Sequence, residues 1–278
     1  MTTQSLHTRI NTQSLHNHSA TTEGDQSMYN PELHTIFINS DATSTPQVIL
    51  SVYVDDLLII RLPSNVETVK EQLQKRFRIK DFGPVTTILG INVNYNTTEG
   101  LLDISQKQKI INLAREFDIL HHKPLRCLLP AGTHLCVIKR TSPAHATLKF
   151  RQLVRALLYI ALATRPDILH AVVYLSQFVC AFNATHFNAA KHVLQYLHST
   201  HMQTICYTRR SDYPQPTIHC DASYGTDPLT MKSYSRNIVM WAGGPIAWWS
   251  QLQKTVALST AEAELAAVTD ATCQVLYL

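Results

Sequence analysis

Two apolar, β-rich runs separated only by a pair of aspartates set the strongest constraint on how this chain folds. The runs are Val48–Val54 and Leu57–Leu62, and Asp55 and Asp56 lie between them. Apolar runs joined by so few polar residues predict a tight β-hairpin. Burying two adjacent carboxylates without a cation is costly. The pair therefore indicates either a Mg²⁺ platform or an exposed Asp-Asp turn, and these residues alone favour neither.

A basic helix is predicted directly after the hairpin. Four apolar residues recur at helical spacing: Val66, Val69, Leu73 and Phe77. Ser64 and Glu67 form a capping box at its start. The same spacing places Lys70, Lys75 and Arg76 on the outward face. A basic helix face is usually only solvated, so contact with phosphate is the less favoured interpretation.

Helices dominate the middle of the chain. A second hairpin over 86–105 and an amphipathic helix over 106–120 precede a connector rich in Pro and His. Three apolar-faced helices then follow, over 150–164, 166–180 and 185–200. Thr164 is the predicted cap of the second of these helices.

The C-terminal part returns to strands and adds a second group of acids. Strands are predicted over 217–223, 236–242 and 245–251, with a helix from Ser259 onward. Asp221 ends the first strand, and Glu262 and Glu264 lie in the first turns of the helix. Carboxylates from a strand and a helix could converge on a pair of metal ions. The residues alone favour ordinary surface acids, because acids are favourable near a helix N-terminus.

Composition excludes several classes of protein. The net charge of +4 is too small for a charge-driven nucleic-acid binder. No apolar run is long enough for a membrane helix and no secretory signal begins the chain, so we expect no membrane association and an intracellular location, cytoplasmic or nuclear. Six scattered cysteines fit neither a disulfide framework nor a zinc finger. Residues 1–30 are polar, and we expect them to be disordered.

Taken in order, the motifs resemble the polymerase region of copia-type long-terminal-repeat retrotransposon Pol polyproteins. YVDDLLI at 53–59 resembles the YVDD polymerase box of that family. The other matching blocks are KRFRIKDFGPVTTILGINV (75–93), SQKQKIINLAREF (105–117), RQLVRALLYIALATRPDILHAVVYLSQF (151–178), AAKHVLQYLHST (189–200), CDASYG (220–225) and IAWWSQLQKTVALSTAEAELAA (246–267). The last two are similar to signatures of the ribonuclease H part.

The resemblance implies a role for each of these acids. Asp55 and Asp56 would hold Mg²⁺ for attack of the primer 3′-hydroxyl on a nucleotide, with Tyr53 near the primer terminus. Asp221 and Glu264 would be the first two metal-holding carboxylates of ribonuclease H, and Glu264 matches that motif better than Glu262. Tyr53, together with the basic Lys75 and Arg76, would contact nucleic acid.

Several departures from the family pattern accompany the resemblance. The family has a further polymerase Asp and a fingers part before the hairpin, and its ribonuclease H has further acids after the Glu-bearing helix. Arg155 replaces a glycine and Ser223 replaces an acid of the family pattern. Both catalytic sites are thus expected to be incomplete, with little activity in the chain alone.

The resemblance implies an α+β fold with three parts. These are a partial reverse-transcriptase palm over 31–125, a linker and helical connection over 126–210, and the N-terminal part of a ribonuclease H-like α/β domain over 211–278. The implied function is that of a retrotransposon RNA-directed DNA polymerase and ribonuclease H fragment. Its partners would be RNA template, DNA primer, RNA–DNA hybrid and deoxynucleotides, and its cofactor Mg²⁺. The alternative is a non-catalytic remnant that binds nucleic acid or a partner.

Overall fold

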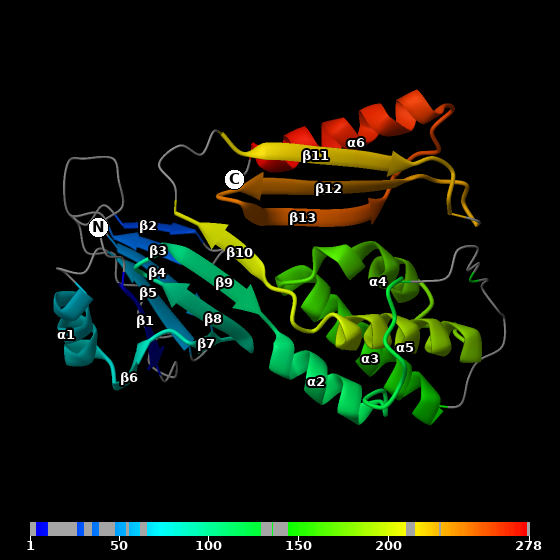
Figure 1. Cartoon of the computed structure of the whole chain (residues 1–278). Coiled ribbons are helices and arrows are strands. Elements are labelled where there is room, and N and C mark those ends of the chain that lie inside the picture. The colour runs from blue at the N-terminus through cyan, green and yellow to red at the C-terminus, as the bar shows by residue number, and fades with distance from the viewer. Residues whose placement is uncertain are drawn as a thin grey trace. The chain divides into compact units, whose positions relative to one another are not determined.

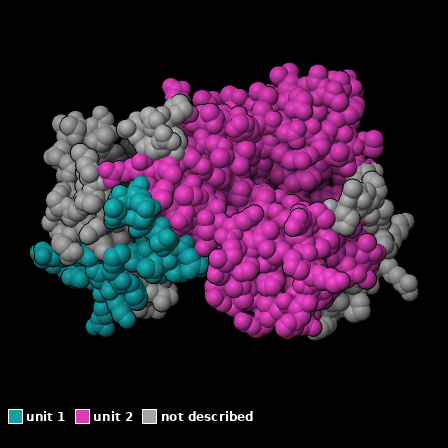
Figure 2. All heavy atoms as spheres, viewed as in Figure 1, with its two compact units in different colours: residues 1–99 teal, residues 100–278 magenta. Residues whose placement is uncertain are grey.

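The computed structural model describes residues 4–10, 27–30, 35–38, 48–53, 56–61, 66–128, 135, 144–209, 215–227 and 229–276. The chain divides into two compact units, Met1–Glu99 and Gly100–Leu278, coloured separately in Figure 2. We refer to them as unit 1 and unit 2. The finer division predicted from the sequence, with boundaries near residues 30, 125 and 210, stays a prediction. None of the helices in the described ranges is long and apolar enough to span a membrane.

Unit 1 is built around an antiparallel sheet. Its strands are β1 (Gln4–Ile10), β2 (Ser27–Asn30), β3 (Thr35–Ile38), β4 (Val48–Tyr53), β5 (Asp56–Arg61) and β6 (Ile79–Pro84). They pair in the order β2-β3-β4-β5-β1-β6 (Figure 1). A short pair, β7 (Thr87–Ile88) and β8 (Ile91–Asn96), follows.

The described part of residues 1–30 departs from the predicted disorder. Strand β1 lies between β5 and β6 and pairs antiparallel with both, and β2 pairs with β3. The composition argument counts apolar side chains, whereas these strands gain backbone hydrogen bonds from neighbours that form the centre of the sheet. Amino-acid composition alone does not reveal these backbone hydrogen bonds.

The predicted hairpin is confirmed. Strands β4 and β5 pair antiparallel, and Tyr53 lies opposite Asp56 at the end of the pair. Their sheet packs on helix α1 (Val66–Arg76), also as predicted. Leu50, Leu57, Ile59 and Val69 are its buried centre. The predicted capping box at Ser64 lies outside the described residues.

Lys70 does not lie on the outward face of α1, as the helical spacing had predicted. It is buried and forms an ion pair with Asp81 of β6, with Nζ 2.5 Å from Oδ2. Asp81 also accepts a hydrogen bond from the N–H of Gly83 at 2.8 Å. Lys70 directly follows Val69, at the edge of the apolar stripe, so a carboxylate on the sheet draws it inward.

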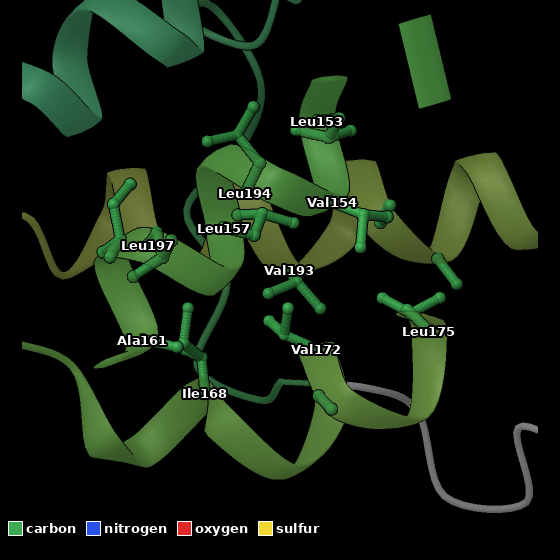
Figure 3. Packing of buried hydrophobic residues seen from close by; sticks show 14 of the residues in the cluster. Leu153, Val154, Leu157, Ala161, Ile168, Val172, Leu175, Val193, Leu194 and Leu197 are labelled. Atoms are coloured by element: carbon green, nitrogen blue, oxygen red, sulfur yellow. The ribbon is translucent and has the colours of Figure 1, made fainter. Parts of the chain in front are cut away.

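Unit 2 contains the predicted helices. Strand β9 (Leu101–Ser105) leads into α2 (Lys107–Glu116), and α3 (Ala144–Ala163), a 3₁₀ turn η3 (Pro166–Ile168), α4 (Leu169–Ser176) and α5 (Ala184–Ser199) follow. The apolar faces of α2 to α5 form one core. Figure 3 shows Leu157 of α3, Val172 of α4 and Val193 of α5 pointing toward one another.

The start of the second helix differs from its prediction. Arg165, not Thr164, occupies the N-cap position of η3, without a capping hydrogen bond from its side chain, and the Thr164 hydroxyl donates to Oε1 of Gln106 at 2.9 Å. The Arg165 guanidinium is buried and binds both carboxylate oxygens of Asp167, at 2.9 and 2.7 Å. It also donates to the carbonyl and the hydroxyl oxygen of Thr200 at 3.1 and 2.7 Å, which ties η3 to the end of α5.

The predicted C-terminal strands and helix are confirmed. Strands β11 (Thr217–Ser223), β12 (Tyr234–Trp241) and β13 (Gly244–Leu252) form an antiparallel sheet, and α6 (Thr260–Val275) begins after the cap Ser259. Strand β10 (Ile205–Thr208) pairs with β9. At Gly244 a Cβ would lie 2.9 Å from the carbonyl oxygen of Cys206, so this approach of β13 to β10 requires glycine.

Candidate nucleic-acid and metal sites

The β4–β5 hairpin presents Tyr53 and Asp56 on one face of the unit 1 sheet. Side chains alternate along a strand, and Val52 and Leu57 pack toward α1. Tyr53 and Asp56, one residue away, therefore lie on the opposite face, where Tyr53 is 55% exposed and Asp56 is half-buried. Asp55 lies outside the described residues.

Basic residues occupy the same row of the sheet. The register places Arg9 of β1 opposite Asp56, and Lys80 of β6 opposite Arg9. The row across β4, β5, β1 and β6 thus reads Tyr53, Asp56, Arg9, Lys80.

Lys75 and Arg76 are exposed on the last turn of α1. Because α1 packs on the face that carries Val52 and Leu57, these two basic residues do not share a face with Tyr53. The structure therefore does not gather the three residues that the sequence assigned to nucleic-acid contact. A polynucleotide that touches all of them would have to pass around an edge of the sheet.

Asp56 fits Mg²⁺ in its donor chemistry and its placement. A carboxylate is the hard oxygen ligand that this ion prefers, and the hairpin holds Asp56 on the face away from the apolar core, beside an exposed tyrosine. Within the described ranges no three His, Cys, Asp or Glu side chains gather as a metal site. Mg²⁺ commonly takes one or two carboxylates and fills its other positions with water and substrate phosphates.

The structure does not bring Asp221 and Glu264 to one face of the unit 2 sheet. Asp221 lies opposite Arg236, 3.7 Å from its Nε, and Arg236 lies opposite Ser250, whose hydroxyl meets His170 of α4 at 3.3 Å. The other face packs on α6, since Gln253 bridges Ser235 of β12 and the Ala263 carbonyl of α6. Figure 1 shows α4 and α6 on different sides of the strands.

Glu262 has a local structural role. Its Oε2 accepts a hydrogen bond from the N–H of Leu258 at 2.7 Å, and its own N–H donates to the Ser259 hydroxyl at 3.1 Å. These two bonds cap α6. The interpretation of Glu262 as an acid placed to favour a helix N-terminus therefore matches its contacts.

A cavity of about 430 Å³ lies between η3–α4 and the Asp221 face of the sheet. We call it the His170 cavity. Residues that line it include Asp167, Leu169, His170, Asp221, Arg236, Ile238 and Trp248. Burial, and then the charge of Arg236, lower the pKa of His170 to about 4, so the imidazole is neutral at pH 7. Sequence analysis missed this cavity, because its residues come from separate segments with no common motif.

Comparison with known proteins places these features in a family. The family model "Reverse transcriptase (RNA-dependent DNA polymerase)" matches residues 21–129. The chain is 34% identical over 239 residues to a retrovirus-related Pol polyprotein from transposon TNT 1-94 of Nicotiana tabacum, covering 83% of this chain and 18% of that protein. It is 31% identical over 238 residues to a transposon Ty5-1 protein of Saccharomyces cerevisiae, covering 83% of this chain and 74% of that protein. A Pol polyprotein from transposon RE1 of Arabidopsis thaliana is 30% identical, with 16% of its length covered.

Proposed function

Because the chain belongs to the copia-type retrotransposon Pol polyproteins, we propose that unit 1 supplies the acidic hairpin of an RNA-directed DNA polymerase site. The observation that carries this proposal is the hairpin register, in which Tyr53 lies opposite Asp56 at the end of β4 and β5. The chain spans less than a fifth of the tobacco polyprotein, so polymerase activity is a proposal for this chain.

Each residue of the hairpin has a role in this proposal. Asp55 and Asp56 would hold Mg²⁺, which when bound supplies the charge that stabilises attack of a primer 3′-hydroxyl on a nucleotide phosphate. Tyr53 offers an exposed aromatic ring next to the acids, on which a terminal base can stack. Lys80 of β6 is exposed in the same row of the sheet, and its positive charge favours a phosphate backbone.

Primer extension on an RNA template tests the polymerase proposal. The variants Asp55→Asn and Asp56→Asn preserve side-chain size and remove one charge each, and Asp118→Asn of unit 2 is the matched control. We expect the small amount of extension by the wild-type chain to fall below detection in the two hairpin variants and to persist in the control. Equal extension by all four proteins would contradict the role of the hairpin.

A second candidate function is nucleic-acid binding without chemistry. It is favoured by the exposed Lys75 and Arg76, which sit apart from the hairpin face. Binding of an RNA–DNA hybrid would then be independent of Mg²⁺ and steeply salt-dependent. Replacing both residues by alanine should lower the slope of log affinity against log salt by about one for each phosphate that is no longer neutralised. A folded chain that binds hybrid but extends no primer would support this candidate over the first.

We further propose that residues 211–278 carry part of a ribonuclease H-like domain. The order of three antiparallel strands and a helix, with Asp221 on the first strand and Glu264 on the helix, supports it. The two carboxylates lie on opposite sides of the sheet, so the test must ask whether they act together. If they do, Asp221→Asn, Glu264→Gln and the double variant should lose hybrid cleavage to the same extent. Additive losses would indicate separate roles.

A further inference from the structure

The His170 cavity has the size and layering of a small-molecule site. Its volume of about 430 Å³ falls in the range typical of ligand pockets. Leu169 is buried and Ile238 and Trp248 are half-buried, whereas the side chains of Arg236 and Asp221 are 40% and 62% exposed. The lining is therefore mainly apolar, with the two charged side chains at its mouth, and this arrangement is typical of small-molecule sites.

Two planar side chains in the cavity are held in place. The indole N–H of Trp248 donates to the carbonyl oxygen of Ala161 at 2.8 Å. The His170 ring meets the Ser250 hydroxyl at 3.3 Å and makes a T-shaped contact with the Tyr234 ring, with centroids 4.9 Å apart. Fixed rings stack on a flat ligand without first losing conformational freedom. The aromatic rings of the cavity are thus preorganised to bind a planar heterocycle.

The charges at the cavity do not favour a phosphate. Each of the two carboxylates, Asp167 and Asp221, has a guanidinium partner, at 2.7 Å from Arg165 and 3.7 Å from Arg236. His170 is neutral at pH 7. Arg236 is the only lysine or arginine among the described residues that line the cavity. With no excess of positive charge, an uncharged ligand fits better than an anion.

The mouth of the cavity presents an acceptor beside a donor. Asp221 and Arg236 are cross-strand neighbours, so a carboxylate with two acceptor oxygens lies next to a guanidinium donor. The Watson–Crick edge of guanine offers two N–H donors beside a carbonyl oxygen, which complements this pair. We propose that the His170 cavity binds a nucleobase, with guanine as the best match. This site is separate from the polymerase hairpin and needs no metal ion.

Equilibrium dialysis of the full chain with labelled guanosine, in EDTA, tests the proposal. We expect saturable binding, weaker by about tenfold for inosine, which lacks one of the two N–H groups, and absent for ribose 5-phosphate. A short single strand containing one guanine distinguishes the source. Tighter binding of the strand would identify a base presented by a polynucleotide, and tighter binding of guanosine a free nucleoside. Equal binding of guanosine and ribose 5-phosphate, or none of either, would overturn the proposal.

Matched variants locate the ligand. Ile238→Trp fills the cavity, and Ile218→Trp adds the same side chain elsewhere on the same sheet. We expect only the first to abolish binding. Asp221→Asn should weaken guanosine at least about tenfold, whereas Glu264→Gln, on the other side of the sheet, should leave binding unchanged. Thermal unfolding of each variant verifies folding. The location would be refuted if Ile218→Trp lost as much binding as Ile238→Trp, or if Glu264→Gln lost as much as Asp221→Asn. This result does not depend on primer extension or hybrid cleavage.

Discussion

Replacing Arg165 by methionine removes the guanidinium that holds η3 to the end of α5. Arg165 is 3% exposed and makes two bonds to Asp167 and two to Thr200. Removing one partner of a fully buried ion pair costs about 3–5 kcal/mol. The Asp167 side chain is 33% exposed, and water reaching it lowers the expected loss to about 2–3 kcal/mol.

Tryptophan fluorescence isolates this effect. The three tryptophans of the chain all belong to unit 2, so their emission reports on its unfolding alone. For a unit of this size, about 2–3 kcal/mol corresponds to a fall in Tm of about 4–12 °C. Arg165→Lys keeps the charge without the two-pronged geometry and should lose about half as much. The double variant with Asp167→Asn should fall short of additivity by about 1 kcal/mol or more. Additive losses, or a Tm within about 1 °C of wild type in Arg165→Met, would refute the reasoning.

Three further predictions concern acid and packing. Burial raises the pKa of Asp81, but the hydrogen bond and charge of Lys70 and a backbone N–H outweigh it and hold that pKa below 3.8. Stability from this pair is therefore present above pH 3.8 and lost below it. In Asp81→Asn, the free energy of unfolding in urea, followed by circular dichroism, should decrease less steeply as the pH falls below 3.8. An unchanged pH dependence would argue against the ion pair. The pKa of His170 is lowered from 6.5 to about 4, so stability should fall as pH drops through this window, by up to about 3 kcal/mol. In His170→Gln the Tm should not follow this trend, and a Tm that still falls would exclude His170 as its cause. Gly244→Ala places a Cβ 2.9 Å from a carbonyl oxygen of β10 and should cost about 1–3 kcal/mol in the urea midpoint, which a wild-type midpoint would contradict.

Local patterns predicted most of the elements. The two apolar runs around Asp55 and Asp56 were enough to place the hairpin, and the spacing from Val66 to Phe77 placed α1. Such signals depend on residues close in sequence, which share one element. These signals could not predict the burial of Lys70, because its partner Asp81 belongs to another element. A helical pattern does not show which neighbouring elements cover a residue at the edge of the apolar stripe.

The candidate sites depend on which helices pack on which face of the sheet, and sequence spacing does not encode this packing. The position of Glu264 relative to Asp221 depends on which face of the sheet α6 packs against. Contacts between distant residues, such as the hydrogen bond from Gln253 to the Ala263 carbonyl, hold α6 on that face. The His170 cavity likewise arises where η3 and α4 meet three strands. The motif around Asp167 marked a helix start, and the same residues prove to form a cavity wall.

The pairing of β9 with β10 makes the helical part of unit 2 an insertion between adjacent strands. Ile104 lies opposite Ile205, so the chain leaves the sheet into α2 and returns beside its point of departure after α5. Both ends of the helical part are therefore anchored at neighbouring positions. A short loop between the two strands would close the gap without altering their register, whereas removal of the helices would also uncover the face of the β11–β13 sheet that contacts Ala161 and His170.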